Sequence, residues 1–158
     1  MKRVGRSLTR KQECERILEA HGPADFERIS EAFDRQFRTL HNRAQLILGV
    51  CGVLISASVL VTTGRLLAGR PSFAHQHLAG VILVIAGALE IAAAAVVVGG
   101  VLNIRWITQQ PGGDLHAWVL TNLLYRDRKT RAYRVANLLV LLSMSSYQVA
   151  IAIVLLQL

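Results

Sequence analysis

One acidic residue, Glu90, stands near the middle of a 25-residue stretch, residues 78–102, that contains no other charged side chain. At about 1.5 Å per residue, such a stretch can cross the roughly 30 Å hydrocarbon layer of a membrane as one helix. A charge at the centre of that layer costs about 3 kcal/mol or more unless it is protonated or paired. Glu90 therefore indicates either a neutral acid that binds neighbouring helices or a carboxylate that responds to protons or cations.

Polar side chains gather at the centre of the last apolar stretch, at a depth in the membrane similar to that of Glu90. They are Ser143, Ser145, Ser146, Tyr147 and Gln148. A protonated Glu90 could donate one hydrogen bond and accept others from Ser146, Tyr147 or Gln148, and so lock the packing of helices or a contact between subunits. The alternative is a titrating carboxylate of the kind found in transport proteins. We favour the neutral acid, because the apolar stretches contain no second acid and no Lys, Arg or His.

No other residue pattern predicts catalysis or a bound cofactor. His75 and His77 form an isolated pair without a neighbouring acid or cysteine, which is more typical of a solvated loop than of a metal site. Cys14 and Cys51 lack the spacing of metal ligands and are predicted to be small packing residues. The motifs of serine hydrolases, P-loops, dinucleotide-binding folds and zinc proteases do not occur. We therefore expect a protein that is not an enzyme and binds no metal or cofactor.

Three apolar windows must position these side chains. They cover residues 44–64, 78–102 and 135–158, and each is at least about 18 residues long and free of Lys and Arg. The sequence therefore predicts an all-α integral membrane protein with three transmembrane helices. A tail of residues 1–43 and a helical loop of residues 104–134 are too short to form a separate core, so we expect one membrane domain over residues 1–158.

Basic residues predict the orientation of the three spans. Ten Lys or Arg residues precede the first span, two lie in the first loop, and six lie between the second and third spans. Short segments rich in Lys and Arg stay on the cytoplasmic side. We therefore expect a multi-pass protein of the cell membrane with a cytoplasmic N-terminus, a cytoplasmic loop 104–134 and an external C-terminus.

The tail predicts two cytoplasmic helices. Thr9 and Gln12 fit a capping box at the start of the first helix, and Gly22-Pro23 ends it. The second helix carries an amphipathic stripe that continues into the first span and consists of Phe26, Ile29, Phe33, Phe37 and Leu40. This Phe stripe would either rest on the membrane surface or on the chain's own loop 104–134, or it would pair with copies from neighbouring subunits.

The loop before the third span predicts a further helix. Residues 111–113 form a turn, Asp114 can cap the helix that follows, and nothing interrupts that helix before Leu156. Its basic cluster consists of Arg126, Arg128, Lys129, Arg131 and Arg134. These residues could bind anionic lipids, at about 1 kcal/mol per charge, or they could be the orientation signal alone. The net charge of +8 does not indicate nucleic acid, because the basic residues flank spans and no recognition fold is present.

Small residues within the spans predict close helix packing. Gly52 and Ser56 in the first span, and Ala95 and Gly99 in the second, have the four-residue spacing that lets helix backbones approach. The order of an entry helix, a two-span hairpin and a second helical stretch before the last span resembles, in arrangement, small bacterial membrane effectors of antiphage signalling. This resemblance implies an oligomerising, non-enzymatic membrane protein and identifies no functional residue.

Two functions follow as hypotheses. In the first, the protein self-associates or binds partner membrane proteins, as a scaffold, an assembly factor or a membrane-perturbing effector. In the second, it is a proton- or ion-responsive channel or transport subunit that uses Glu90.

Overall fold

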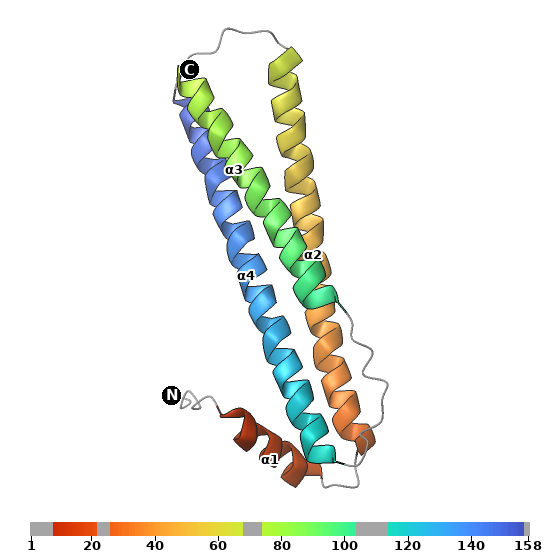
Figure 1. Cartoon of the computed structure of the whole chain (residues 1–158). Coiled ribbons are helices and arrows are strands. Elements are labelled where there is room, and N and C mark those ends of the chain that lie inside the picture. The colour runs from red at the N-terminus through yellow and green to blue at the C-terminus, as the bar shows by residue number, and fades with distance from the viewer. Residues whose placement is uncertain (1–7, 22–25, 68–73, 104–113, 157–158) are drawn as a thin grey trace, which may run out of the picture.

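The computed structural model describes residues 8–21, 26–67, 74–103 and 114–156, which are helical almost throughout (Figure 1). In chain order, the elements are α1 (Arg10–His21), α2 (Phe26–Leu67), α3 (Ala74–Val96), the π-helical segment η1 (Val97–Leu102) and α4 (Leu115–Leu155). The all-helical class predicted from the sequence is confirmed for these residues. The predicted breaks at residues 22–23 and 111–113, and the side chain of His75, lie outside the described part of the chain.

Three of these helices are long and apolar enough to cross a membrane. The candidate spans are Phe26–Val61 in α2, His77–Leu102 in α3 and η1, and Leu115–Ile153 in α4, and each contains an apolar stretch of at least 18 residues. Large apolar side chains cover their outward surfaces, and Leu60 of α2 and Val84 of α3 are 75% and 70% exposed. Such surfaces are unfavourable in water and suit a hydrocarbon layer. The chain therefore has the features of a multi-pass membrane protein.

Two predicted helix starts are confirmed. At the start of α1, the Thr9 N–H donates to Gln12 Oε1 at 3.1 Å, and the Gln12 N–H lies 3.5 Å from Thr9 Oγ1, which is the reciprocal pattern of a capping box. At the start of α4, Asp114 accepts a hydrogen bond from the His116 N–H at 2.9 Å. From there α4 continues for 41 residues, so the predicted single helix through the loop and the last span is also confirmed.

The end of the second apolar window differs from the regular α-helix that we expected. Val97–Leu102 forms a π-helical segment that lies against α4. A Cβ atom on Gly100 would lie only 2.6 Å from the Cβ of Ala132 on α4. The missing side chain of Gly100 therefore allows the close approach of η1 and α4.

α3 and α4 run antiparallel (Figure 1), and both helices carry buried small residues at every seventh position. They are Ala79, Ala86 and Ala93 on α3, and Ala136, Ser143 and Ala150 on α4. None of the six is more than 2% exposed. The seven-residue spacing keeps one face of each helix on its neighbour, and the small side chains let the two backbones approach. We call this contact the α3–α4 seam.

α2 packs on the α3–α4 pair along only part of its length. Ala44, Ile47 and Cys51 are buried in a core shared with α3, η1 and α4. Cys51 is the last buried side chain among the described residues of α2, and residues 59–61 are 45% to 75% exposed. In Figure 1 the last turns of α2 diverge from α3 and α4, while α1 lies at the opposite end of the bundle. We call that opposite end the α1 end.

Candidate functional site at a buried carboxyl

Glu90 of α3 is fully buried among the three long helices. Ser143 of α4 places its Oγ 2.8 Å from Glu90 Oε1, and the Tyr147 hydroxyl of α4 lies 3.5 Å from Glu90 Oε2. The first distance is that of a good hydrogen bond, whereas the second is at the outer limit. Cys51 of α2 is near enough to interact electrostatically with the carboxyl group. The acid is therefore enclosed by groups from α2 and α4.

Each of the two hydroxyl groups also approaches a backbone carbonyl. Ser143 Oγ lies 3.1 Å from the carbonyl oxygen of Ala86 on α3, and the Tyr147 hydroxyl lies 3.2 Å from that of Leu54 on α2. The Ser143 contacts connect α4 to α3, and the Tyr147 contacts connect α4 to both α2 and α3. The polar groups around Glu90 therefore link all three long helices.

The structure separates the predicted polar cluster of α4 into two sets. Ser143 and Tyr147 face Glu90. Ser146 donates instead to the Leu142 carbonyl of its own helix, and Gln148 is exposed. Ser143, which we had not expected as a direct partner, belongs to the α3–α4 seam. The seven-residue spacing of Ala136, Ser143 and Ala150 was the sequence signal that could have identified it.

This arrangement can hold one proton. A protonated carboxyl group has one O–H donor, whereas an ionised one can only accept hydrogen bonds. Because the three apolar windows contain no Lys, Arg or His, an ionised Glu90 would depend on two hydroxyl groups for compensation. Among the described residues, no group of three or more His, Cys, Asp or Glu side chains could hold a metal ion. The chemistry that the site supports is the gain and loss of a single proton.

The small residues predicted to pack helices lie on outward surfaces. Gly52 and Ser56 of α2 are exposed, as are Ala95 of α3 and Gly99 of η1. A Cβ atom on Gly52 or Gly99 would meet no atom within 4 Å. Within the chain, close packing is provided instead by the α3–α4 seam. The outward set on α3 and η1 forms one stripe of exposed small residues, Ala88, Ala92, Ala95 and Gly99, which we call the outward small stripe.

The Phe stripe of α2 packs against α1 and α4 at the α1 end. Ile29 and Phe33 are buried in a cluster with Cys14 of α1 and with Val119 and Leu123 of α4. The rings of Phe26 and Phe33 contact that of Trp118, at centroid distances of 4.9 and 5.9 Å. Phe37 contacts Tyr125 at 5.6 Å, and Leu40 packs on the core between the long helices. The chain's own helices therefore cover much of this stripe.

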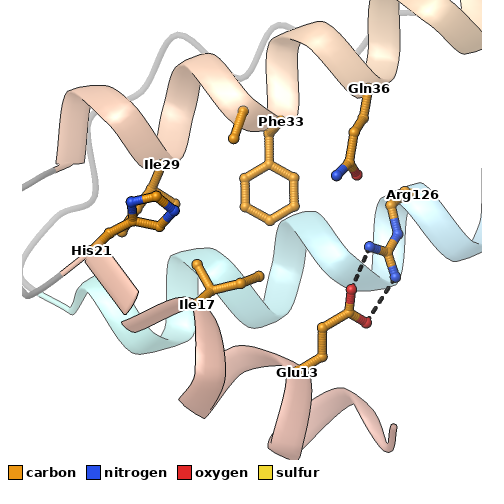
Figure 2. Close-up of a pocket in the computed structure, with 8 residues that line it drawn as sticks. Glu13, Ile17, His21, Ile29, Phe33, Gln36 and Arg126 are labelled. Carbon is orange, nitrogen blue, oxygen red and sulfur yellow. Dashed lines mark hydrogen bonds and ion pairs between the residues drawn. The ribbon is translucent and has the colours of Figure 1, made fainter. Parts of the chain in front are cut away.

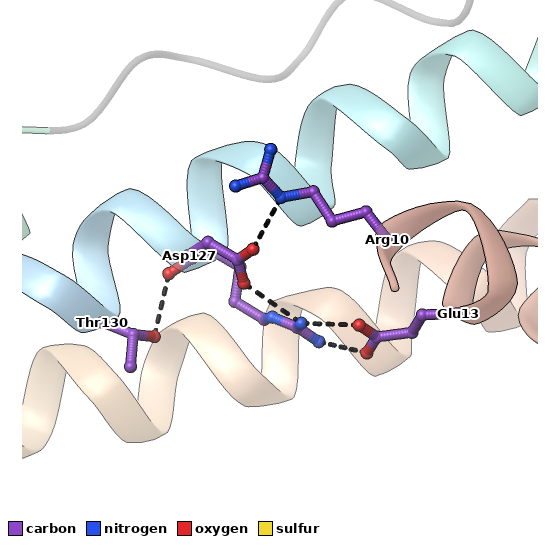
Figure 3. A network of polar contacts seen from close by, with 5 residues as sticks. Arg10, Glu13, Asp127 and Thr130 are labelled. Carbon is purple, nitrogen blue, oxygen red and sulfur yellow. Dashed lines mark hydrogen bonds and ion pairs between the residues drawn. The ribbon is translucent and has the colours of Figure 1, made fainter. Parts of the chain in front are cut away.

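A polar network fixes α1 on α4 (Figure 3). Arg126 donates two hydrogen bonds to the Glu13 carboxylate, at 2.6 and 2.9 Å, and a third to Asp127 at 3.3 Å. Asp127 also accepts a hydrogen bond from Arg10 Nε at 2.9 Å. Burial alone would raise the pKa of Asp127, but the hydrogen bonds from Arg10 and Arg126 outweigh it and lower that pKa below its usual value. The hydrogen bond to Glu13 raises the pKa of Arg126.

Two members of the basic cluster interact with other side chains of the protein. Arg126 belongs to the polar network, and Lys129 is 8% exposed, with its ammonium group 4.7 Å from the centre of the Tyr125 ring. The other three members, Arg128, Arg131 and Arg134, are exposed. These three arginines are therefore the members that can meet an external anion.

A hollow of about 220 Å³ lies between α1, α2 and α4, beside the pair of Glu13 and Arg126 (Figure 2). Ile17, Ile29 and Phe33 form its apolar part. Glu13 and Arg126, which also line the hollow, form an ion pair with each other. Sequence reasoning missed this hollow, because its walls come from segments about a hundred residues apart.

No protein-family model, curated protein or solved structure matches the chain. The residues themselves therefore carry the functional argument.

Proposed function

We propose that the chain is a non-enzymatic protein of the cell membrane that acts by binding other transmembrane helices. Its partner is a second copy of the chain or another membrane protein, for which it serves as a scaffold, an assembly factor or a membrane-perturbing effector. Following the basic residues, the proposed orientation places the N-terminus and residues 104–134 in the cytoplasm and the C-terminus outside.

The observation that carries the proposal is the outward small stripe. Lipid tails are as apolar as leucine, so helices in a membrane associate through close packing, which small residues permit. Ala88, Ala92, Ala95 and Gly99 are exposed and follow one another at spacings of three or four residues. On α2, Gly52 and Ser56 are likewise small and exposed, and they are four residues apart. Since the chain packs its own helices through other residues, these two surfaces remain for a second protein.

The Phe stripe is the weaker candidate for self-association. Ile29 and Phe33 are 1% and 5% exposed, because α1 and α4 already cover them. A second copy would have to displace α1 in order to reach these side chains. We therefore place the proposed contact between copies on the faces of α2 and α3 within the membrane.

Anionic lipid is the second partner that we propose. Arg128, Arg131 and Arg134 are exposed and directly precede the predicted third span at residue 135. Arginines beside a span attract anionic headgroups with about 1 kcal/mol per charge.

Energy transfer between donor- and acceptor-labelled copies in liposomes tests the proposal. We expect transfer in the wild type at a fixed protein-to-lipid ratio, and its loss when Ala92→Leu and Ala95→Leu fill the outward small stripe. The matched control carries Ser145→Leu and Ala152→Leu, which add bulk at exposed small positions of α4. Equal transfer in the stripe variant and the control would contradict the proposed contact.

A second candidate function rests on the burial of Glu90. A proton- or ion-responsive subunit would use this acid as its binding or gating group. Purified protein in liposomes should then dissipate an imposed ion or proton gradient, and Glu90→Gln should abolish that flux because an amide cannot carry the proton. A wild type that moves no ions would leave helix association as the function.

A further inference from the structure

The hydroxyl groups of Ser143 and Tyr147, beside Glu90, each have two hydrogen-bond acceptors within reach but only one proton to donate. Each hydroxyl group has one O–H to donate. Ser143 lies within reach of both the Ala86 carbonyl and Glu90 Oε1, and Tyr147 lies within reach of both the Leu54 carbonyl and Glu90 Oε2. The protonation state of Glu90 therefore decides which acceptor each hydroxyl group uses.

With Glu90 protonated, every O–H in the group has an acceptor. The carboxyl O–H donates to Ser143 Oγ, and Ser143 then donates to the Ala86 carbonyl. Tyr147 donates to the Leu54 carbonyl, which at 3.2 Å is the nearer of its two acceptors. In this arrangement Tyr147 ties α4 to α2.

With Glu90 ionised, the carboxylate has no proton and needs donors, because a bare charge in an apolar interior is costly. The charge-assisted bonds from Ser143 and Tyr147 to the carboxylate are then the stronger ones. Tyr147 turns away from α2. The Leu54 carbonyl is not left without a partner, because Ser58 Oγ of the same helix donates to it at 2.9 Å.

The change of acceptor by Tyr147 affects α2 because Leu54 lies close to the point where α2 stops packing on the other helices. Cys51 is the last buried side chain among the described residues of α2, and beyond it residues 59–61 are largely exposed. Within the apolar windows, the hydrogen bond from the Tyr147 hydroxyl to the Leu54 carbonyl joins α4 to α2. In Figure 1 the last turns of α2 diverge from α3 and α4, so the Leu54 contact lies where α2 begins to leave the pair.

We infer that Glu90 and Tyr147 form a proton-operated latch: protonation of Glu90 directs Tyr147 to the Leu54 carbonyl and holds α2 on α4 at Leu54, and loss of the proton releases this contact. Tyr147 of α4 is the titratable group within hydrogen-bonding reach of Glu90, Cys51 of α2 is a second titratable group buried near it, and the apolar windows contain no further charged residue. The latch is independent of helix association and of ion flux.

Spin-label distance measurements in lipid nanodiscs test the latch. Labels on Leu60→Cys of α2 and Ile151→Cys of α4 report the distance between the two helices, since both positions are exposed. Cys14 and Cys51 are buried and remain unlabelled. Dilution with unlabelled protein removes distances between copies. A second pair, Val81→Cys on α3 with Ile151→Cys, spans the α3–α4 seam and serves as the control.

We expect the Leu60 to Ile151 distance of the wild type to be shorter and more narrowly distributed at acidic pH than at alkaline pH. Glu90→Gln should keep the short distance at every pH, because the amide is never charged. Tyr147→Phe should give the long distribution at every pH, and the control pair should not move.

Three outcomes overturn the inference. They are a wild-type distance that does not change with pH, a pH response that persists in Glu90→Gln or Tyr147→Phe, and an equal response of the control pair. The last outcome would show that the whole bundle loosens rather than α2 alone.

Discussion

At the scale of single residues, Glu90 is stabilised by the small side chains around it. A carboxyl group in hydrocarbon is costly when it lacks hydrogen bonds. Here Ala86 and Ala93 leave room on the α3–α4 seam, and Ser143 and Tyr147 supply the polar partners. The acid thus contributes to the contact between α3 and α4.

Glu90→Leu should therefore lower stability, because it leaves the Ser143 and Tyr147 hydroxyl groups without their carboxyl partner. We expect a loss of about 1 kcal/mol, the size of one hydrogen bond between membrane helices. Thermal unfolding in detergent measures this loss. Glu90→Gln is the matched control and should unfold near the wild-type temperature, since the amide donates and accepts hydrogen bonds. A leucine variant as stable as the glutamine variant would refute the bonding role.

The partners of Glu90 could be predicted from the sequence only in part. The isolation of the acid and the polar centre of the last window were visible, and Tyr147 was among the expected partners. Ser143 and Ser146 have the same side chain and similar depth, so hydroxyl chemistry does not distinguish them. What separates them is the face of α4 that meets α3, and this face is set by the packing of two helices on each other.

At the scale of elements, Gly100 tests the contact between η1 and α4. Gly100→Ala should destabilise the protein by about 1 to 3 kcal/mol, the usual cost of overpacking, because the new Cβ would meet Ala132 at 2.6 Å. Gly99→Ala is the matched control, since a Cβ there meets no atom within 4 Å. Thermal unfolding compares the two, and Ala132→Gly should restore the stability of Gly100→Ala. Equal effects at both glycines would show that η1 does not pack on α4 as described.

The polar network predicts how firmly α1 is docked. Cys14 of α1 is fully buried, so the rate of its alkylation reports the fraction of molecules in which α1 has detached. Glu13→Gln removes the charge that binds Arg126 and should weaken docking by roughly 1 kcal/mol, which corresponds to about fivefold faster alkylation. Mass spectrometry at constant pH measures the rate. Glu19→Gln, at an exposed position of the same helix, should leave it unchanged, and a response equal to that of Glu13→Gln would contradict the docking role.

The same network predicts that acid weakens the docking of α1. The pKa of Asp127 is lowered in the folded protein, so its contribution to stability is complete above the usual carboxyl pKa and is lost as the pH falls through the lowered pKa. Backbone hydrogen exchange of α1, expressed as protection factors, should therefore show less protection in acid. Asp127→Asn should have reduced protection at neutral pH and a smaller change on acidification. Identical pH profiles in both proteins would exclude Asp127 as the cause.

The extents of the helices were more predictable than their contacts. The capping residues Thr9 and Asp114 mark helix starts locally, and neither α2 nor α4 contains a proline that would interrupt it. The close approach of η1 to α4 was missed because Gly100 and Ala132, which meet there, are 32 positions apart in the chain. The docking of α1 was missed for the same reason.

At the scale of the whole molecule, the basic residues predict which ends lie on which side of the membrane. A reporter that is active only outside the cytoplasm should be active when fused after Leu158 and silent when inserted at Gly113. The reason is that ten and six basic residues lie in the tail and the second loop, against two in the first loop. Reporter activity measured in intact cells checks the prediction. The reverse pair of activities would invert the proposed orientation.

The seam between α3 and α4 also has a consequence for synthesis. Ser143 follows Glu90 by 53 positions, and a ribosome adds roughly 5 to 20 residues per second, so the acid waits roughly 3 to 10 seconds for its partner. During that interval α3 has left the ribosome with an acidic side chain that α4 cannot yet bind. Release of α3 alone into lipid would expose this acid to hydrocarbon. For a chain that spans the membrane as proposed, the order of synthesis predicts that α3 and α4 enter the bilayer together, as a hairpin in which Glu90 already contacts Ser143.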